Sequence, residues 1–192
     1  MKAVKETIRK YYKYQYQDFV QPVLTSNGTL GGDKFAVADK YGSTTAYKAF
    51  DGSITSAWSS AATNTADYLI FYNPKPLLIT NIECFNYTWI TGKWELYGSN
   101  DNFLYEILAS GTNTQVSGSF NIDLSSNTKA YKYYRMDSLS IVGVYQRVGW
   151  GEIEITAKTQ EITVTNDSDY DFYKDIDVYK LSKIDENYYG II

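Results

Sequence analysis

The side chains best suited to catalysis in this sequence are its carboxylates, because the usual nucleophile–base pairs are missing. The 192-residue chain contains no histidine and one cysteine, Cys84. This excludes Ser-His and Cys-His mechanisms and the HExxH type of zinc site. Paired carboxylates can hydrolyse glycosides, and the acids available for this are Asp51, Glu83, Glu95, Asp101, Glu152 and Glu154. None of them has a recognisable catalytic spacing, so we expect a protein that is not an enzyme.

Tyrosine offers a second kind of chemistry, that of binding. The chain has 20 Tyr against 8 Phe and 4 Trp. A tyrosine combines a flat apolar face with a hydroxyl, which suits sugar-binding surfaces and wet interfaces. It also suits the half-exposed faces of β-strands. The composition by itself leaves both interpretations open.

Charge and hydropathy narrow the range of partners. The formal net charge is −4 and the sequence pI is about 4.9. No long run of Lys or Arg indicates a nucleic-acid groove, and no run of 18 apolar residues indicates a membrane span. The first residues lack the apolar middle region of a signal peptide, which predicts a protein that is made and kept in a cytoplasm or is exported without a cleaved signal. Cys84 lies in an apolar run and is expected to be a small core residue.

The elements that must position these side chains are predicted to be mainly strands. From residue 46 to residue 158, short apolar or alternating runs are separated by turn signals, as in a β-sandwich or barrel. LIFY (Leu69–Tyr72) and LLITNIECFNY are separated by the breaker NPKP. In GWGEIEITAK, Ile153 and Ile155 lie on one predicted face, and Glu152 and Glu154 on the other.

The two ends of the chain differ from this middle part. Residues 1–20 are predicted to be a helix that ends before Pro22. Its apolar stripe consists of Val4, Ile8, Tyr11, Tyr12 and Tyr16. The helix either packs on its own domain or pairs with copies of itself or with a partner. Residues 159–192 are acidic and Tyr-rich and are expected to include a β-hairpin. The predicted division is therefore 1–20, 21–158 and 159–192.

Five segments, in order, resemble landmarks of discoidin-like domains, also called coagulation factor V/VIII type C domains. They are AYKAFDGSITSAW (46–58), LIFYNPKPLLITNIEC, WELYGSNDNFLYEIL, KAYKYYRM and GWGEIEI. Together they span about residues 46 to 158, well over half of the chain. The resemblance implies an all-β, galactose-binding-like jelly-roll sandwich, with two antiparallel sheets and loops gathered at one end. It also implies that Trp58 is a core residue.

The resemblance further implies a calcium site. In relatives the loop after "FDG" often wraps a calcium ion, and a Glu on the last strand completes the site. The matching positions here are Asp51, Ser53, Ser56 and Glu152, and oxygen ligands are what Ca²⁺ requires. Ser53 and Ser56 stand where an acid and a threonine are common, which leaves only two formal charges. The alternative is that Asp51 caps its own Asp-Gly turn.

A glycan-binding face is implied on the loops at one end of the sandwich. The matching loops are 85–93 and 140–150, and their candidate contacts are Tyr87, Trp89, Tyr145, Arg147 and Trp150. Aromatic faces pack on the apolar patches of a sugar, and polar side chains bond its hydroxyls. In the alternative interpretation the two tryptophans close the core and the two tyrosines cover its rim.

The expected function is that of a non-catalytic carbohydrate-binding module in a bacteriophage virion, contributing to adhesion to host-surface or mucosal glycans. Residues 20–37, VQPVLTSNGTLGGDKFAV, resemble the lead-in to such domains in phage tail and fibre proteins. Residues 1–20 and 159–192 are then expected to contact other virion proteins or to form a homo-oligomer. The alternative is a purely structural virion protein for assembly or decoration that binds no glycan.

Overall fold

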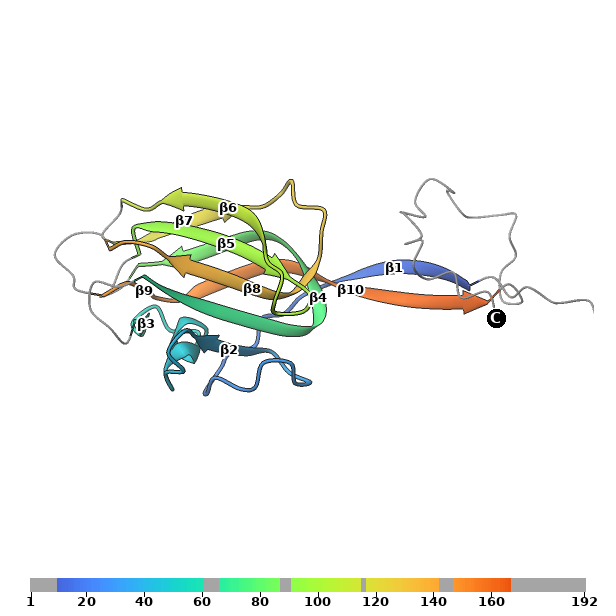
Figure 1. Cartoon of the computed structure of the whole chain (residues 1–192), viewed down its shortest axis with the longest axis horizontal. Coiled ribbons are helices and arrows are strands. Elements are labelled where there is room, and N and C mark those ends of the chain that lie inside the picture. Colours follow the sequence, from blue (N-terminus) through green and yellow to red (C-terminus); the bar gives the residue numbers. More distant parts are fainter. Residues whose placement is uncertain (1–9, 61–65, 87–90, 115–116, 142–146, 167–192) are drawn as a thin grey trace, which may run out of the picture. The chain divides into compact units, whose positions relative to one another are not determined.

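A computed structural model describes residues 10–60, 66–86, 91–114, 117–141 and 147–166 (Figure 1). Within these ranges the chain is almost entirely antiparallel β-structure, so the predicted fold class is confirmed. The elements are β1 (Lys10–Asp18), β2 (Ala36–Asp39), the 3-10 turn η1 (Ala46–Ala49), β3 (Trp58–Ser59), β4 (Asp67–Phe85), β5 (Lys93–Ser99), β6 (Glu106–Thr112), β7 (Ser119–Asp123), β8 (Tyr131–Ser138), β9 (Gly149–Trp150) and β10 (Ile153–Asn166). No helix in these ranges is long and apolar enough to cross a membrane.

The chain divides into two compact units. One unit is Gln17–Gln160, and the other combines Met1–Tyr16 with Glu161–Ile192. In the second unit the described residues are the outer ends of β1 and β10, which are neighbours in the sheet. The predicted C-terminal hairpin falls in residues 167–192, outside the described residues. The core, the candidate site and the pocket described below all belong to the unit Gln17–Gln160.

The predicted N-terminal helix is wrong over Lys10–Asp18, which forms strand β1 beside β10. The segment KYYKYQYQD carries Tyr at alternate positions, which is the period of a strand, and Tyr favours strands. The same tyrosines also fit a spacing of three to four, which is why a helical stripe was predicted. Pairing with β10 decides between the two patterns. Just after β1, Phe19 N donates to Ala157 O at 2.9 Å.

Strand β4 belongs to both layers of the sandwich and joins them. Its first half lies between β2 and β8, and its second half lies between β10 and β7. One layer therefore contains β2, the start of β4, β8, β5 and β6, and the other contains β7, the end of β4 and β10. Figure 1 shows the β4 ribbon turning at the point where it passes from one layer to the other.

The break predicted at NPKP is wrong, because residues 73–76 lie inside the continuous 19-residue strand β4. They form the bend between its two halves. The register with β8 shifts between Tyr72 and Leu77, so Pro74 and Pro76 lie where the β8 ladder is interrupted, and a proline has no N–H to donate. Asn73 Nδ2 donates to Lys75 O at 2.7 Å across the bend.

The core lies between the two layers and is rich in aromatic rings. Phe71 and Tyr134 stack with ring centroids 5.3 Å apart. Trp58 is 0% exposed, and its Nε1 donates to the Asp39 carboxylate at 2.7 Å. The predictions that Trp58 and Cys84 are core residues are therefore confirmed.

Gly98 in β5 is required by the close approach of an aromatic ring. A Cβ atom at this position would lie 2.6 Å from Cδ2 of Tyr131. We expect Gly98→Ala to lower the free energy of unfolding by about 1–3 kcal/mol, because a well-packed ring must move. Urea denaturation measures this. Ser110→Ala, at an exposed position of neighbouring β6, should change stability by less than about 0.5 kcal/mol. A Gly98→Ala protein as stable as the parent would contradict the packing argument.

Candidate functional site

The described ends of the loops 85–93 and 140–150 lie side by side at one end of the sandwich. Thr91 forms an isolated β-bridge with Ile141. Gly92 N donates to Ser140 O at 2.6 Å, and Thr91 N donates to Gly149 O at 3.1 Å. These bonds make one continuous structure, hereafter the loop end, from two segments that are far apart in the sequence.

A third segment, near residues 113–118, joins the loop end. Asn86 N donates to Gly118 O at 2.8 Å, and Asn113 N donates to Gly92 O at 2.9 Å. The Asn86 side chain accepts a bond from Asn113 Nδ2 at 2.9 Å through its Oδ1. Its own Nδ2 is buried and has no hydrogen-bond partner among the described residues. A buried donor without a partner costs about 1–3 kcal/mol, so the loop end has an amide donor suited to an incoming oxygen atom.

Of the predicted glycan contacts, only Arg147 and Trp150 lie among the described residues. Tyr87, Trp89 and Tyr145 lie outside the described residues. Arg147 is half-buried, and its guanidinium has no ion-pair or hydrogen-bond partner in the described ranges. A guanidinium carries five N–H donors, so Arg147 retains the donors that the hypothesis assigns to it.

Trp150 needs a correction, because its ring is part of the core. It is 2% exposed, pairs with Trp58 across β3 and β9, and packs against Phe120 with ring centroids 6.0 Å apart. A ring that is buried in this way has no open face on which a sugar could stack. Its Nε1 is nevertheless buried without a hydrogen-bond partner among the described residues. Alternation in GWGEIEI could not reveal this, because β9 is too short to show a pattern.

The structure brings together the four predicted metal ligands, Asp51, Ser53, Ser56 and Glu152. Ser56 Oγ donates to the Asp51 carboxylate, 2.7 Å from each of its oxygens. The same hydroxyl lies 3.3 Å from the Ser53 carbonyl oxygen. Glu152 Oε2 accepts a bond from Gly52 N at 3.1 Å across 100 positions of sequence. The two carboxylates therefore meet around the Asp-Gly turn.

Glu152 is a buried acid, although strand alternation placed it on the outer face. It is 2% exposed and precedes β10 rather than lying in it. Burial raises the pKa of its carboxyl to about 7, and the nearby Asp51 charge adds to this rise. The bonds from the Gly52 and Ser53 N–H groups act in the opposite direction. A positive charge at this point would stabilise the ionised carboxylate.

The donor set fits a hard cation. Ser56 Oγ is also 3.3 Å from the Lys48 carbonyl oxygen, so carbonyl, hydroxyl and carboxylate oxygens all converge there. Calcium takes such mixed oxygen donors. In the described ranges no three His, Cys, Asp or Glu side chains are grouped so that they could hold a metal ion, so any cation here must use the neutral oxygens as well. The alternative role is also seen, because Asp51 Oδ1 accepts a bond from Ser53 N at 3.0 Å.

The oxygen cluster, defined as Asp51, Ser56, Glu152 and the carbonyls of Lys48 and Ser53, is connected to the loop end by backbone bonds. Phe85 N donates to Glu152 O at 2.8 Å, and Gly151 N donates to Phe85 O at 3.1 Å. The segment that carries Glu152 is therefore held against the segment that carries Asn86.

Two further polar groups have structural roles. Asp39, which the sequence reading did not single out, is buried and accepts bonds from Trp58 Nε1 and from Ser43 N at 2.7 Å. Its only sequence signal was an acid within the apolar run AVAD.

Arg135 forms an ion pair with Asp137, with Nε 2.8 Å from Oδ1. Its guanidinium also lies over the rings of Tyr68, Tyr97 and Tyr105.

Two antiparallel layers with loops gathered at one end define a galactose-binding-like jelly-roll sandwich. No family profile and no curated protein matches this sequence. Solved structures do match its fold, and we describe three of them.

The first is the family 32 carbohydrate-binding module of Clostridium perfringens NanJ in complex with galactose, at 15% identity over 66% of this chain and 93% of that chain, with a TM-score of 0.54. The second is CpGH89CBM32-5 from Clostridium perfringens in complex with GalNAc-β-1,3-galactose. It is 14% identical, the match covers 76% of this chain and 94% of that chain, and the TM-score is 0.51. The third is chitosan-binding module 1 of a chitosanase/glucanase from Paenibacillus sp. IK-5. It is 20% identical, the match covers 65% of this chain and 95% of that chain, and the TM-score is 0.52. At these identities the likeness establishes the fold. All three are carbohydrate-binding modules, which are not themselves catalytic.

Proposed function

We propose that this protein is a non-catalytic carbohydrate-binding module that holds a glycan at the loop end. The observation that carries the proposal is the backbone pairing of the described ends of segments 85–93, 113–118 and 140–150, beside the buried Asn86 Nδ2, which has no hydrogen-bond partner among the described residues. Sugar hydroxyls are acceptors that could pair with such a donor. The carbohydrate-binding modules that share the fold support the same assignment.

Arg147 is the described side chain best suited to hold the sugar. It is half-buried, which lowers the loss of side-chain freedom on binding, and it has no acidic partner in the described ranges. Tyr87, Trp89 and Tyr145 complete the proposal as the aromatic faces on which a ring stacks. Trp150 takes no part in the proposed contact, because its ring and its Nε1 are both buried.

We expect Arg147→Ala to weaken binding to any glycan identified on an array by about tenfold or more, because a hydrogen bond from a charged donor contributes about 1.5–3 kcal/mol. The array is run with the full chain, with and without Ca²⁺, and the best ligand is titrated by calorimetry. Lys158→Ala, an exposed change on β10, serves as the control and should bind like the parent. An array without binding in either condition, or unchanged affinity in Arg147→Ala, would contradict the proposal.

Calcium is proposed as a structural ion of this module. Asp51, Glu152 and Ser56 would hold it, together with the carbonyl oxygens of Lys48 and Ser53. Its charge would compensate two carboxylates, one of them buried, in a site otherwise short of positive charge. It would thereby hold the loop after β2 and η1 against the start of β10 and, through Phe85, support the loop end.

The proposed setting is a phage virion, in which the module contributes to adhesion to host-surface or mucosal glycans. The resemblance of residues 20–37 to phage lead-in segments supports this setting. That segment belongs to the folded module, because Gln21 Nε2 donates to Ile153 O at 2.7 Å and Gln21 Oε1 accepts from Ile155 N at 2.8 Å. Residues 1–20 and 159–192 would contact other virion proteins or further copies of the chain. The alternative is a purely structural virion protein. It predicts that the protein assembles but binds no glycan on the array.

A further inference from the structure

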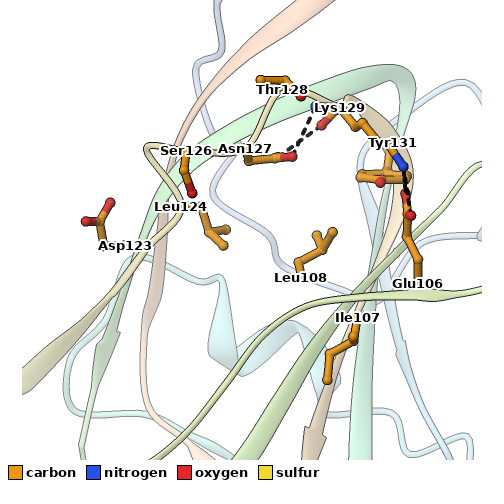
Figure 2. A pocket seen from close by; sticks show the side chains of 10 residues that line it. All are labelled: Glu106, Ile107, Leu108, Asp123, Leu124, Ser126, Asn127, Thr128, Lys129 and Tyr131. Atoms are coloured by element: carbon orange, nitrogen blue, oxygen red, sulfur yellow. Dashed lines mark hydrogen bonds and ion pairs between the residues drawn. The ribbon is translucent and has the colours of Figure 1, made fainter.

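A pocket of about 300 Å³ opens between edge strand β6 and the segment that follows β7. Figure 2 shows the side chains that surround it. They are Glu106, Ile107, Leu108, Asp123, Leu124, Ser126, Asn127, Thr128, Lys129 and Tyr131. Leucines from two elements provide apolar walls, and the remainder is mainly polar. Pockets that hold small ligands begin at about this volume.

This pocket is separate from the loop end. Strand β8 starts at the pocket with Tyr131 and ends with Ser138, whose Oγ accepts a bond from Thr91 Oγ1 at 2.9 Å. Seven residue steps along a strand correspond to about 23 Å. Figure 1 shows β8 running along the length of the sandwich. A ligand in the pocket therefore does not touch the segments proposed to hold glycan.

Tyr131, which lines the pocket, carries a buried hydroxyl without a partner among the described residues. Tyr131 is 5% exposed, and its hydroxyl makes no hydrogen bond to any described residue. The ring is fixed in place, because it lies against Gly98 and makes an edge-to-face contact with Tyr134 at a centroid distance of 5.7 Å. The hydroxyl cannot turn away without disturbing the core. An oxygen atom from a bound molecule would remove a cost of about 1–3 kcal/mol.

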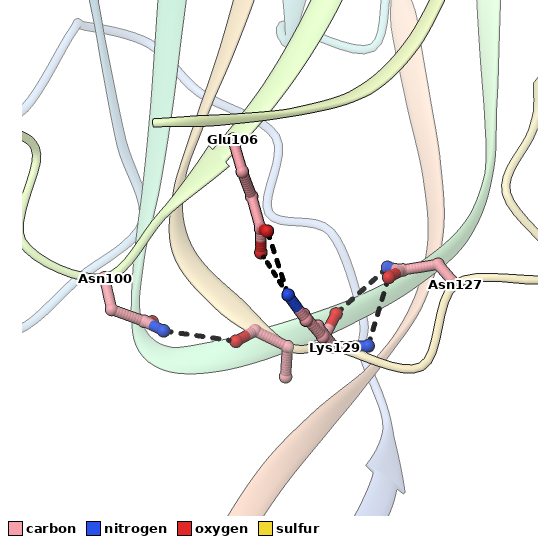
Figure 3. A network of polar contacts seen from close by, with 5 residues as sticks. Asn100, Glu106, Asn127 and Lys129 are labelled. Carbon is pink, nitrogen blue, oxygen red and sulfur yellow. Dashed lines mark hydrogen bonds and ion pairs between the residues drawn. The ribbon is translucent and has the colours of Figure 1, made fainter. Parts of the chain in front are cut away.

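Polar contacts within the rim of the pocket, and between the rim and neighbouring residues, hold its shape. Lys129 Nζ lies 2.9 Å from Glu106 Oε2 and bridges the segment after β7 to β6. Asn127 Oδ1 accepts a bond from Lys129 N at 3.0 Å, and Asn127 Nδ2 donates to Ile79 O at 3.3 Å. Asn100 Nδ2 donates to Ala130 O at 3.4 Å. Figure 3 shows this network around Lys129. A pocket ordered in advance loses less entropy when it binds a ligand.

Charge at the pocket disfavours an anionic ligand. The single lysine is paired with Glu106. Bonds from Ser125 lower the pKa of Asp123, which therefore stays anionic at neutral pH. The lining thus has one more negative than positive charge and would repel an anion. Apolar leucine walls beside amide and hydroxyl groups match the apolar patches and hydroxyls of an uncharged sugar ring.

We propose that this pocket is a second binding site that takes a single neutral sugar unit, with the Tyr131 hydroxyl as its innermost hydrogen-bonding group. Such a site would let one module contact a glycan surface at two points. Two sites on one chain raise the overall avidity without new contacts at either site. The proposal does not depend on the loop end, because the two sites share no residue.

The test is a protein-observed NMR titration of the full, isotope-labelled chain with D-galactose, D-glucose and N-acetyl-D-galactosamine, each to tens of millimolar. We expect one or more of these sugars to shift the amide signals of residues 106–108 and 124–131, with a Kd in the millimolar range, about −4 kcal/mol. Tyr131→Phe removes only the oxygen and should weaken this binding about threefold to tenfold. Its thermal stability should equal or exceed that of the parent, since an unpaired hydroxyl is lost.

Ser126→Trp is the second variant, because it places an indole at the pocket from an exposed position. It should abolish the same shifts without disturbing the core. The proposal is overturned if none of the three sugars shifts these signals, or if the shifts are unchanged in both variants. Arg147→Ala should leave the pocket signals unaffected, so failure at the loop end and failure at the pocket are read separately.

Discussion

Replacing Trp58 by alanine should lower the free energy of unfolding by about 3–5 kcal/mol, the range for removing a large aromatic side chain from a core. Trp58 is fully buried and lies at the end of the signature segment 46–58. Its backbone pairs with Trp150, and its Nε1 donates to buried Asp39. The substitution leaves a cavity and also removes a donor from a buried carboxylate. A domain whose total stability is about 5–15 kcal/mol would lose a large part of it.

Trp58→Phe separates the two contributions. It keeps an aromatic ring in the core and removes the N–H, so Asp39 retains only the bonds from Ser43. We expect a loss of about 1–3 kcal/mol from the hydrogen bond that the buried carboxylate no longer receives, added to the smaller cost of lost volume. Urea denaturation of both variants gives the comparison. If Trp58→Ala costs less than about 1 kcal/mol, the residue does not have the structural role assigned to it.

Raising the pH from about 5 to 8 in calcium-free solution should destabilise the protein through Glu152. Its pKa in the folded protein is about 7 against an ordinary value of 4.5. Between these values the folded protein binds more protons than the unfolded chain, so the free energy of unfolding falls as the pH rises. The loss begins near pH 4.5 and is complete above about pH 7. Its size is on the order of 2–3 kcal/mol.

Glu152→Gln is the matched control, since it keeps the shape of the side chain and removes the titration. Its stability should change much less over the same pH range. Adding Ca²⁺ at pH 8 should stabilise the unsubstituted protein again. Its free energy of unfolding should rise by about 2.7 kcal/mol when the Ca²⁺ concentration is a hundred times the Kd. Glu152→Gln should lose most of that response. An equal calcium-induced rise in melting temperature in both proteins would argue against the proposed site, and equal pH slopes would argue against a buried, titrating Glu152.

Most of the strands could be predicted from local pattern. GWGEIEITAK alternates, and Ile153 and Ile155 are buried as that pattern requires. The errors arose where two patterns fit the same residues or where a local rule was overridden. Tyrosines in residues 10–18 fit both a strand and a helix, and pairing with β10 decided for the strand. Pro74 and Pro76 do not end β4, because they lie at its bend, where the β8 ladder shifts register.

The candidate site was predictable only in part. Resemblance to discoidin-like domains brought Asp51 and Glu152 into one hypothesis, and the structure places them beside the same turn. Local pattern could not show that Glu152 is buried, because its burial depends on a loop 100 residues away. In the same way, Trp150 is a core residue because Trp58 and Phe120 cover its ring.

The sequence by itself determined the chemistry that is available and the class of fold. A chain without histidine has no histidine base, and alternating apolar residues bury one face of a strand wherever it pairs. Only the tertiary structure decided which polar groups meet and which are left without partners. Asn86 Nδ2 and the Tyr131 hydroxyl are buried donors because strands distant in sequence enclose them. Hydrogen-bond satisfaction is a property of the assembled fold, and no local sequence rule encodes it.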